Sequence, residues 1–350
     1  MLDYYKLAGP LVRLLDAETA HGVAVRLLKN GLVPVPKIFD APRLRTRVFG
    51  LDFVNPIGLA AGFDKNAEVV DAMLAQGFGF VEAGSVTPEP QLGNPKPRMF
   101  RLPEDGGVIN RLGFNNQGCD RVAKRLQARR AFPRAGVVGL NLGKNKDQQD
   151  AIADFVAGVE RLGPFADYIV INVSSPNTPG LRALQSAETL NGLLRATRSA
   201  VDALAVRKPL LVKIAPDLHE DELTAIAEVV MAARIDGLIA GNTTVARDGL
   251  RGQHRGETGG LSGKPLFERA TRVLRTVYRA TGGRLPLIGC GGVHDGATAY
   301  AKIRAGASLV QLYTALVYEG AGLIQRIARD LDVLLERDGF ALVSDAVGQE

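Results

Sequence analysis

Residues 168–177 read Tyr-Ile-Val-Ile-Asn-Val-Ser-Ser-Pro-Asn, and this stretch contains the pattern that decides the fold. Tyr168–Val173 is a short and almost continuously apolar run, which is typical of a β-strand buried on both faces. The run passes directly into small polar residues. Runs of the same kind occur at Pro56–Ala60, Gly79–Ala83, Val137–Leu142, Leu210–Ile214, Gly237–Gly241, Pro286–Gly289 and Ser308–Leu312. The sequence therefore predicts eight buried strands.

The segments between these runs have helical spacing of their apolar residues. We expect helices at Ala67–Gln76, Asp221–Ala233 and Gly296–Ala305, after the first, fifth and seventh strands. Eight strands that alternate with helices predict an α/β fold of the (β/α)₈ type, a TIM barrel, over residues 41–350. The structural alternative that this pattern leaves open is a doubly wound open sheet.

Residues 1–40 do not fit the alternation and form a small N-terminal extension. Their apolar spacing predicts two short helices, Tyr4–Leu15 and Ala17–Leu28, with Asp16 as the N-cap of the second and Gly31 as its end. The pair combines an apolar face with basic residues. It could be a cap packed on the barrel or a hairpin that lies in a membrane interface, and the periodicity alone does not decide between them.

Composition narrows the class of protein but not its ligand. Hydrophobic residues make up 46% of the 350 residues and charged residues 23%, which excludes wholesale disorder and a disulfide scaffold. The net charge of +6 suits anionic ligands, anionic membranes and nucleic acid equally. Cys119 and Cys290 lie far apart and the four histidines are scattered, so we expect reduced cysteines and no bound metal.

Polar side chains are concentrated at the C-terminal ends of the predicted strands, where barrel enzymes assemble their active sites. Most are amides or hydroxyls: Asn110, Asn141, Asn172, Asn177, Asn242, Ser175 and Thr243. Such a set can hold a planar ring rich in heteroatoms through neutral hydrogen bonds. It is poorly equipped for metal-assisted hydrolysis or for a mechanism with two carboxylates.

Glycines and lysines add to this picture. Gly289, Gly291 and Gly292 follow the seventh strand, where barrels often bind a phosphate, although such a run can also be a plain turn. Lys65 and Lys213 supply positive charge that suits a substrate carboxylate or an anionic reduced cofactor. A redox cofactor with a phosphate tail fits these residues.

Several ordered motifs resemble those of the membrane-associated, quinone-dependent (class 2) dihydroorotate dehydrogenases. The resemblance covers nearly the whole chain, from the Glu18–His21 segment to about Tyr318. Its motifs are Asn55–Lys65 (NPIGLAAGFDK), Gly93–Arg98 (GNPKPR), Asn110–Asn116 (NRLGFNN), Ile171–Gly180 (INVSSPNTPG), Lys213–Asp217 (KIAPD), Gly260–Leu266 (GLSGKPL) and Ala305–Thr314 (AGASLVQLYT).

The resemblance implies one FMN per chain and assigns a role to each matching residue. The implied FMN-binding residues are Ala61, Gly62, Phe63, Asp64, Lys65, Ser85, Asn141, Asn172, Lys213, Gly241, Gly263, Gly292, Tyr313 and Thr314. The implied dihydroorotate-binding residues are Lys65, Asn110, Arg111, Leu112, Gly113, Phe114, Asn172, Asn177, Asn242 and Thr243. Ser175 stands where class 2 enzymes place the catalytic base and class 1 enzymes place a cysteine.

The implied activity is that of a flavin-dependent oxidoreductase of pyrimidine biosynthesis. It would oxidise (S)-dihydroorotate to orotate and pass the electrons through FMN to a membrane quinone. The resemblance makes the N-terminal helices the quinone entrance, lined by His21, Arg101 and Tyr313, and places the protein on the cytoplasmic side of the cell membrane as a peripheral protein. It favours a monomer without a nucleic-acid partner.

Three alternatives remain. A class 1 enzyme that uses fumarate or a nicotinamide is disfavoured by Ser175 and by the N-terminal extension. A non-redox phosphate-binding barrel would have similar glycines but would not need so many amides. A pure binding module would not need a nucleophile on a loop rich in proline and glycine.

Overall fold

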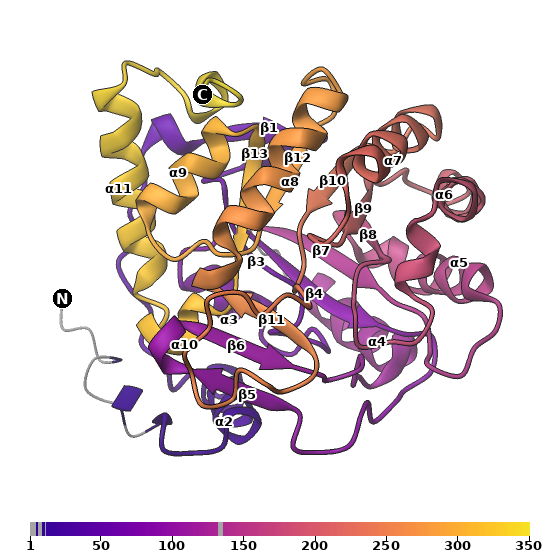
Figure 1. The fold of residues 1–350 in the computed structure, drawn as a ribbon, viewed down its shortest axis with the longest axis horizontal. Coiled ribbons are helices and arrows are strands. Elements are labelled where there is room, and N and C mark those ends of the chain that lie inside the picture. Colours follow the sequence, from indigo (N-terminus) through magenta and orange to yellow (C-terminus); the bar gives the residue numbers. More distant parts are fainter. Residues whose placement is uncertain (1–4, 6–8, 11, 132–135) are drawn as a thin grey trace.

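A closed barrel of eight parallel strands forms the centre of the molecule in the computed structural model, which describes residues 5, 9–10, 12–131 and 136–350 (Figure 1). The strands are β3 (Ile57–Leu59), β4 (Phe80–Val86), β7 (Val137–Leu142), β8 (Tyr168–Asn172), β9 (Leu210–Ile214), β10 (Gly237–Ala240), β12 (Leu287–Cys290) and β13 (Ala307–Leu312). Pairing of β13 with β3 closes the ring. The predicted barrel and its eight strands are confirmed, and the open sheet is excluded.

Helices surround this barrel. They are α3 (Val70–Ala75), α4 (Gly118–Arg130), α5 (Ala151–Leu162), α6 (Ala187–Asp202), α7 (Glu220–Ala232), α8 (Phe267–Ala280), α9 (Gly296–Arg304), α10 (Ala315–Glu319) and α11 (Leu323–Arg337). The three predicted helices are confirmed as α3, α7 and α9. The first begins three residues later than predicted because Ala67 has a positive φ of 52°, which a helix does not allow.

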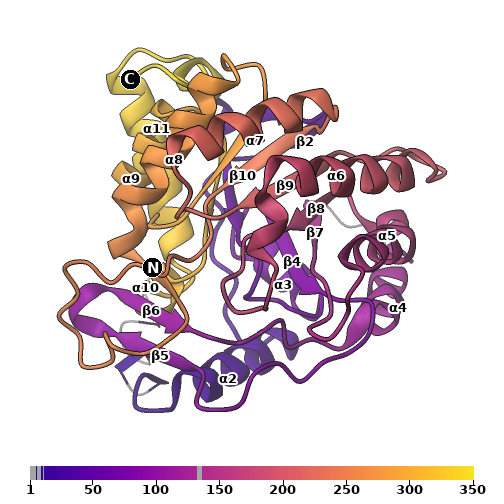
Figure 2. The same cartoon turned by 45° about the vertical axis from the view of Figure 1, so that its right-hand side comes forward.

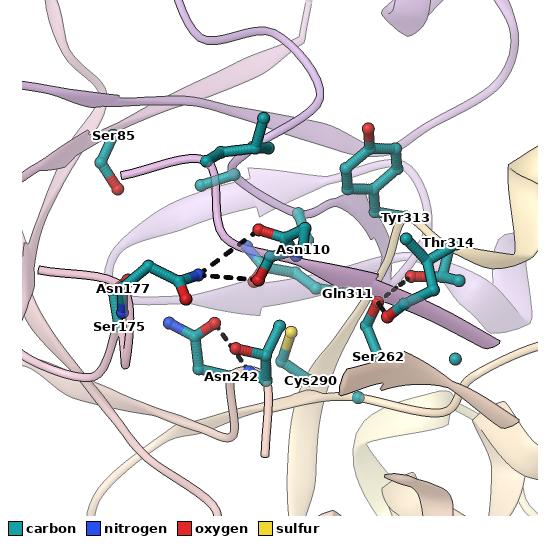
Figure 3. A pocket seen from close by; sticks show the side chains of 18 of the residues that line it. Ser85, Asn110, Ser175, Asn177, Asn242, Ser262, Cys290, Gln311, Tyr313 and Thr314 are labelled. Carbon is teal, nitrogen blue, oxygen red and sulfur yellow. Dashed lines mark hydrogen bonds between the residues drawn. The ribbon is translucent and has the colours of Figure 1, made fainter. Parts of the chain in front are cut away.

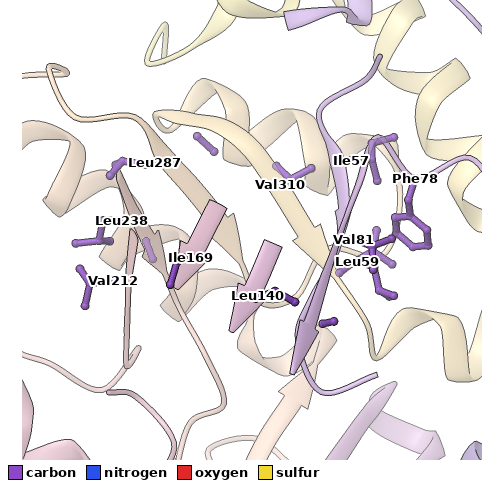
Figure 4. Close-up of a cluster of buried hydrophobic side chains, with 14 of the residues drawn as sticks. Ile57, Leu59, Phe78, Val81, Leu140, Ile169, Val212, Leu238, Leu287 and Val310 are labelled. Atoms are coloured by element: carbon purple, nitrogen blue, oxygen red, sulfur yellow. The ribbon is translucent and has the colours of Figure 1, made fainter. Parts of the chain in front are cut away.

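Alternation along the strands divides the apolar side chains into two clusters. In β8, Ile169 and Ile171 belong to a cluster that includes residues of the surrounding helices, part of which Figure 4 shows. Tyr168 and Val170 belong to a second cluster that contains strand residues and no helix residue, so it fills the inside of the barrel. The barrel is therefore a packed core rather than a pore.

An antiparallel hairpin that the sequence analysis missed packs on the inner cluster. It consists of β1 (Thr46–Val48) and β2 (Leu51–Phe53). Phe53 of this hairpin lies edge-on against Phe80 of the barrel, with 5.4 Å between the ring centroids. The hairpin therefore closes the end of the barrel opposite to the strand ends that carry the polar residues.

A second unpredicted element is a three-stranded antiparallel sheet, in the order β11–β6–β5. Its strands are β5 (Met99–Leu102), β6 (Gly107–Asn110) and β11 (Gly260–Gly263). The segments that carry them follow barrel strands β4 and β10, so the sheet lies at the carboxyl end of the barrel. Helix α2 (Ala17–Lys29) lies beside this sheet in both views (Figures 1 and 2).

Helix α2 confirms the second of the two predicted N-terminal helices. The Asp16 carboxylate accepts hydrogen bonds from the backbone N–H groups of Glu18 and Thr19, as an N-cap should. The helix ends before Gly31, which has the expected positive φ of 67°. Residues 4, 6–8 and 11 of the predicted helix Tyr4–Leu15 lie outside the described residues. Among the described residues, no helix is both long enough and apolar enough to cross a bilayer.

Candidate active site

A cavity lies at the carboxyl end of the barrel, between the strand ends and the sheet β11–β6–β5 (Figure 3). It brings together most of the site residues that the sequence predicted. Those that line it are Ala61, Gly62, Lys65, Ser85, Asn110, Leu112, Gly113, Phe114, Asn172, Ser175, Asn177, Lys213, Asn242, Thr243, Gly263, Gly292, Tyr313 and Thr314. They come from every strand end of the barrel except that of β7, and from the added sheet.

A fully buried carboxylate, that of Glu82, lies beneath this cavity. Its Oε1 accepts a hydrogen bond of 2.8 Å from Nδ2 of Asn141. Its Oε2 accepts one of 2.6 Å from Nε2 of Gln311 and one of 3.1 Å from the hydroxyl of Tyr168. Burial raises the pKa of Tyr168 well above its ordinary value, and the Glu82 charge adds to this, so the phenol stays protonated and donates. Sequence reasoning did not single out Glu82.

The hydrogen bond to Glu82 fixes the orientation of the next amides. Since Nδ2 of Asn141 is engaged, its Oδ1 accepts from Nδ2 of Asn172 at 3.1 Å. Oδ1 of Asn172 in turn accepts from the Ser174 hydroxyl at 2.8 Å, and that hydroxyl accepts from Nδ2 of Asn242 at 2.7 Å. Each side chain thus determines which group of the next one donates and which accepts, from the barrel interior to the cavity wall.

Gln311 is a cavity residue that the sequence analysis quoted within a motif but assigned no role. Its Nε2 is engaged by Glu82, whereas its buried Oε1 has no hydrogen-bond partner among the described residues. A buried acceptor without a partner is costly. This oxygen therefore suits an N–H group of a ligand. The signal in the sequence was a polar residue in the otherwise apolar run of β13.

Ser175 lies in the loop after β8 and faces the cavity (Figure 3). Its Oγ accepts a hydrogen bond of 3.2 Å from the backbone N–H of Asn177. Nδ2 of Asn177 donates to the carbonyl oxygen of Asn110 at 3.1 Å, which ties the loop to the sheet. The hydroxyl of Thr178 is buried and has no partner among the residues that the structure describes. The loop therefore presents the Ser175 hydroxyl to the cavity and carries a second hydroxyl, that of Thr178, which is free to form a hydrogen bond.

Two lysines bring positive charge to the cavity. Nζ of Lys65 donates to the carbonyl oxygen of Gly62 at 2.8 Å, and burial lowers the pKa of Lys65 to about 8. Lys213 is buried in β9 and forms no salt bridge within the described part of the chain. The cavity can therefore attract anionic groups.

The part of the cavity at the ends of β11, β12 and β13 has the features of a phosphate site. Gly263 and Gly292 have positive φ values of 97° and 81°, and a Cβ at Gly292 would clash with the backbone of Phe267. The Thr314 hydroxyl, just before the short helix α10, donates to the hydroxyl of Ser262 at 2.8 Å. Barrels commonly bind a phosphate between the loops after strands seven and eight and such an extra helix.

Five of the predicted residues, Phe63, Asp64, Asn141, Gly241 and Arg111, do not line the cavity. Asn141 lies directly behind it. Asp64 is buried and organises its own loop by accepting backbone N–H bonds. Gly241 has a positive φ of 115°, and a Cβ there would clash with the carbonyl oxygen of Cys290. The Arg111 guanidinium forms a 2.7 Å ion pair with Glu257.

Phe63 belongs to an aromatic group that connects the cavity with α2. Its ring lies 5.1 Å from the His21 ring and 5.4 Å from the Tyr313 ring, centroid to centroid. Nδ1 of His21 lies 3.3 Å from the Tyr313 hydroxyl. Burial lowers the pKa of His21 to about 3, so the ring is neutral. Arg101 donates to the carbonyl oxygen of Leu15 at 2.8 Å, close to the start of α2.

Several further apolar residues of the cavity were assigned no role by the sequence analysis. They are Met99, Val108, Leu266, Val293, Leu312 and Val317. Several come from the sheet β11–β6–β5 or the segments beside it, and without that sheet the sequence gives no reason to place them at a site. These apolar side chains shield the amides and hydroxyls of the cavity from water.

The fold and this cavity place the chain among the (β/α)₈-barrel enzymes. The dihydroorotate dehydrogenase family model matches residues 43–335. The protein named dihydroorotate dehydrogenase (quinone) from Azorhizobium caulinodans is 56% identical, covering 100% of this chain and 99% of that one. Its namesake from Rhodospirillum rubrum is 57% identical, covering 100% and 95%.

A solved structure agrees with these matches. The ligand-free enzyme of this type from Eimeria tenella superposes with a TM-score of 0.93 at 44% identity, covering 95% of this chain and 99% of that one. The chain therefore belongs to the dihydroorotate dehydrogenase family, and the predicted family is confirmed.

Proposed function

We propose that the cavity is the site where this chain, a quinone-dependent dihydroorotate dehydrogenase of pyrimidine biosynthesis, binds FMN and dihydroorotate. The chain oxidises dihydroorotate to orotate and uses a quinone as the electron acceptor. The observation that supports this site most directly is the convergence of Ser175, an amide network and two lysines on one cavity. A non-redox barrel has no need for this combination.

The cavity residues fit FMN. The phosphate would lie at Gly263, Gly292 and Thr314, where the backbone can approach closely, and the ring would lie over the amides and Lys213. The orphan Oε1 of Gln311 and the donor and acceptor groups of the wall suit a ring rich in heteroatoms. Bound there, FMN would supply the hydride acceptor for the substrate and the route by which the electrons pass on to the quinone. Lys213 supplies fixed positive charge beside it.

Dihydroorotate would be held by the other wall of the cavity. Asn110, Asn177, Asn242 and Thr243 offer neutral hydrogen bonds, and Lys65 offers a cation for the substrate carboxylate. Ser175 takes the proton from C5 of the substrate onto its Oγ. A serine hydroxyl is a weak base, so Ser175 must release its own hydroxyl proton as it takes the proton from C5. We assign to the unpartnered hydroxyl of Thr178 the role of relaying that proton, together with a bound water, towards solvent.

The N-terminal extension, residues 1–40, serves the quinone and the membrane. His21, Phe63 and Tyr313 form a direct contact between α2 and the cavity. Leu32 and Val35, just beyond α2, have 67% and 64% of their surface exposed. Together with the basic residues of the last turn of α2, they form a surface suited to the headgroup region of an anionic membrane. We place the protein, as a peripheral monomer, on the cytoplasmic side of the cell membrane.

The function predicts a coloured protein with a defined acceptor preference. Purified chain should be yellow and release FMN on denaturation. Dihydroorotate should drive reduction of a soluble quinone analogue much faster than reduction of fumarate or NAD, measured by orotate absorbance. A colourless protein that cannot be reconstituted with FMN, or one that prefers fumarate, would contradict the proposal.

Replacement of Ser175, the proposed base, should affect only the half-reaction in which dihydroorotate reduces FMN. We expect Ser175→Ala to keep FMN but to slow its reduction by dihydroorotate by about 10²- to 10⁴-fold, because proton removal loses its acceptor. Ser175→Cys should retain more activity, since a thiol ionises more readily than a hydroxyl. Anaerobic stopped-flow measures the rates, and Ser199→Ala, on the exposed face of α6, is the control. Unchanged reduction in Ser175→Ala would rule out this role.

The lowered pKa of Lys65 predicts a pH dependence. The protonated form binds a carboxylate, and it is lost above the pKa of about 8. The dissociation constant of orotate should therefore be flat below pH 8 and rise above it, by up to about tenfold per pH unit. Calorimetry from pH 6 to 9.5 tests this. Lys65→Met should weaken binding at pH 7 and flatten the profile, whereas the exposed Lys124→Met should change neither.

Membrane binding should depend on the exposed residues after α2. The double variant Leu32→Ser, Val35→Ser should weaken binding to vesicles of anionic phospholipid on the order of tenfold, because buried apolar area is lost. Added salt should weaken binding of the unaltered protein, since part of the attraction is Coulombic. Vesicle flotation measures both effects. Val206→Ser, which alters an equally exposed valine between α6 and β9, is the control; an equal loss with it would contradict the assignment.

A further inference from the structure

Helix α2 is joined to the rest of the molecule by a buried ion pair. The guanidinium of Arg98 donates from Nε to Oε2 of Glu18 at 3.0 Å and from Nη2 to Oε1 at 2.7 Å. Only 7% of the surface of Arg98 is exposed. The nearby guanidinium lowers the pKa of Glu18, so the carboxylate is charged. Removing one partner of a bidentate pair with so little access to water leaves the other charge uncompensated, which costs more than losing an ordinary surface ion pair.

The other donor group of Arg98 holds the loop between β4 and β5. Its Nη1 donates to the carbonyl oxygens of Leu92 and Asn94, both at 2.7 Å. The same arginine therefore uses one side of its guanidinium for α2 and the other for this loop. Among the described residues, these bonds engage all three nitrogens of the side chain.

Asn94 continues the connection to the substrate side of the cavity. Its Nδ2 donates to the carbonyl oxygen of Arg111 at 3.0 Å and to that of Asn177 at 3.3 Å. The backbone N–H of Asn177 donates to Oγ of Ser175, as described above. A continuous series of hydrogen bonds thus runs from Glu18 on α2 to the hydroxyl of the proposed base.

We propose that Glu18 and Arg98 are positioning residues for the dihydroorotate site, so that the seating of α2 and the binding of substrate or product are thermodynamically linked. This inference rests on the proposed function of the cavity. If α2 is correctly seated, Arg98 holds Asn94, and Asn94 holds the loop of Asn177 in the geometry that binds the ligand. Linkage is reciprocal, so a ligand in the cavity must also stabilise the seating of α2.

Hydrogen exchange on the unaltered, FMN-loaded protein tests the reciprocal effect. Saturating orotate should slow exchange of the α2 amides, residues 17–29, several-fold relative to the protein without orotate. The amides of α7, a helix packed between α6 and α8 and without a bond to this loop among the described residues, should not change. If orotate binds by calorimetry but α2 exchange is unaffected, the inference is wrong. If orotate does not bind at all, the proposed function fails as well.

A conservative variant tests the forward effect. Glu18→Gln keeps the shape but removes the charge that Arg98 pairs with. It should raise the orotate dissociation constant and the KM for dihydroorotate on the order of tenfold, with a smaller change in kcat. The matched control is Glu68→Gln, which breaks the 3.0 Å ion pair of Lys29 at the other end of α2. Equal KM values for Glu18→Gln and the unaltered protein would overturn the inference, as would an equal rise with Glu68→Gln.

Discussion

The site depends on one polar side chain, that of Glu82, which is fully buried in the barrel. A carboxylate in such a place is tolerated only if its oxygens accept hydrogen bonds, and Asn141, Tyr168 and Gln311 supply three. Because ionised carboxylates only accept, each partner must turn its donor inwards. The amide oxygens of Asn141 and Gln311 are then available for other partners. The polarity of the cavity floor is therefore fixed before any ligand enters, which is the preorganisation that electrostatic catalysis requires.

The apolar core of the barrel supports this carboxylate from beneath. Phe80 and Tyr168 lie inside the barrel with ring centroids 6.3 Å apart. They fit there because the neighbouring strands β3 and β7 carry glycines at the paired positions. A Cβ at Gly58 would clash with the Phe80 ring, and one at Gly139 with the Tyr168 ring. The packing of these two rings in turn fixes the position of the Tyr168 hydroxyl, which donates to Glu82. Packing and hydrogen bonding at the centre of the barrel are thus parts of a single constraint.

The sequence could predict the barrel because each strand is a short apolar run buried on both faces, and strand ends of a parallel barrel must meet at one end. For the same reason it could bring residues as distant as Ser85 and Thr314 to one cavity. It could not predict the sheet β11–β6–β5, because β6 (Gly107–Asn110) and β11 (Gly260–Gly263) are four residues each and lie far apart in the chain. It also could not give the direction of each amide, which depends on contacts between strands. Glu82 was missed although a carboxylate within an apolar run is itself a signal.

The N-terminal extension shows why order along the chain and contact in space must be kept apart. Residues 1–40 stand outside the alternation of strands and helices, which suggests a separate unit. Yet α2 contacts the cavity residue Tyr313 through His21 and contacts Arg98 of the loop between β4 and β5 through Glu18, less than one turn apart on the helix. Little of the ion pair is open to solvent, since the side chain of Arg98 is 7% exposed and that of Glu18 is 16% exposed. Because the two contacts lie close together on one helix, a displacement of α2 would disturb the ion pair with Arg98 and the contact with Tyr313 at the same time.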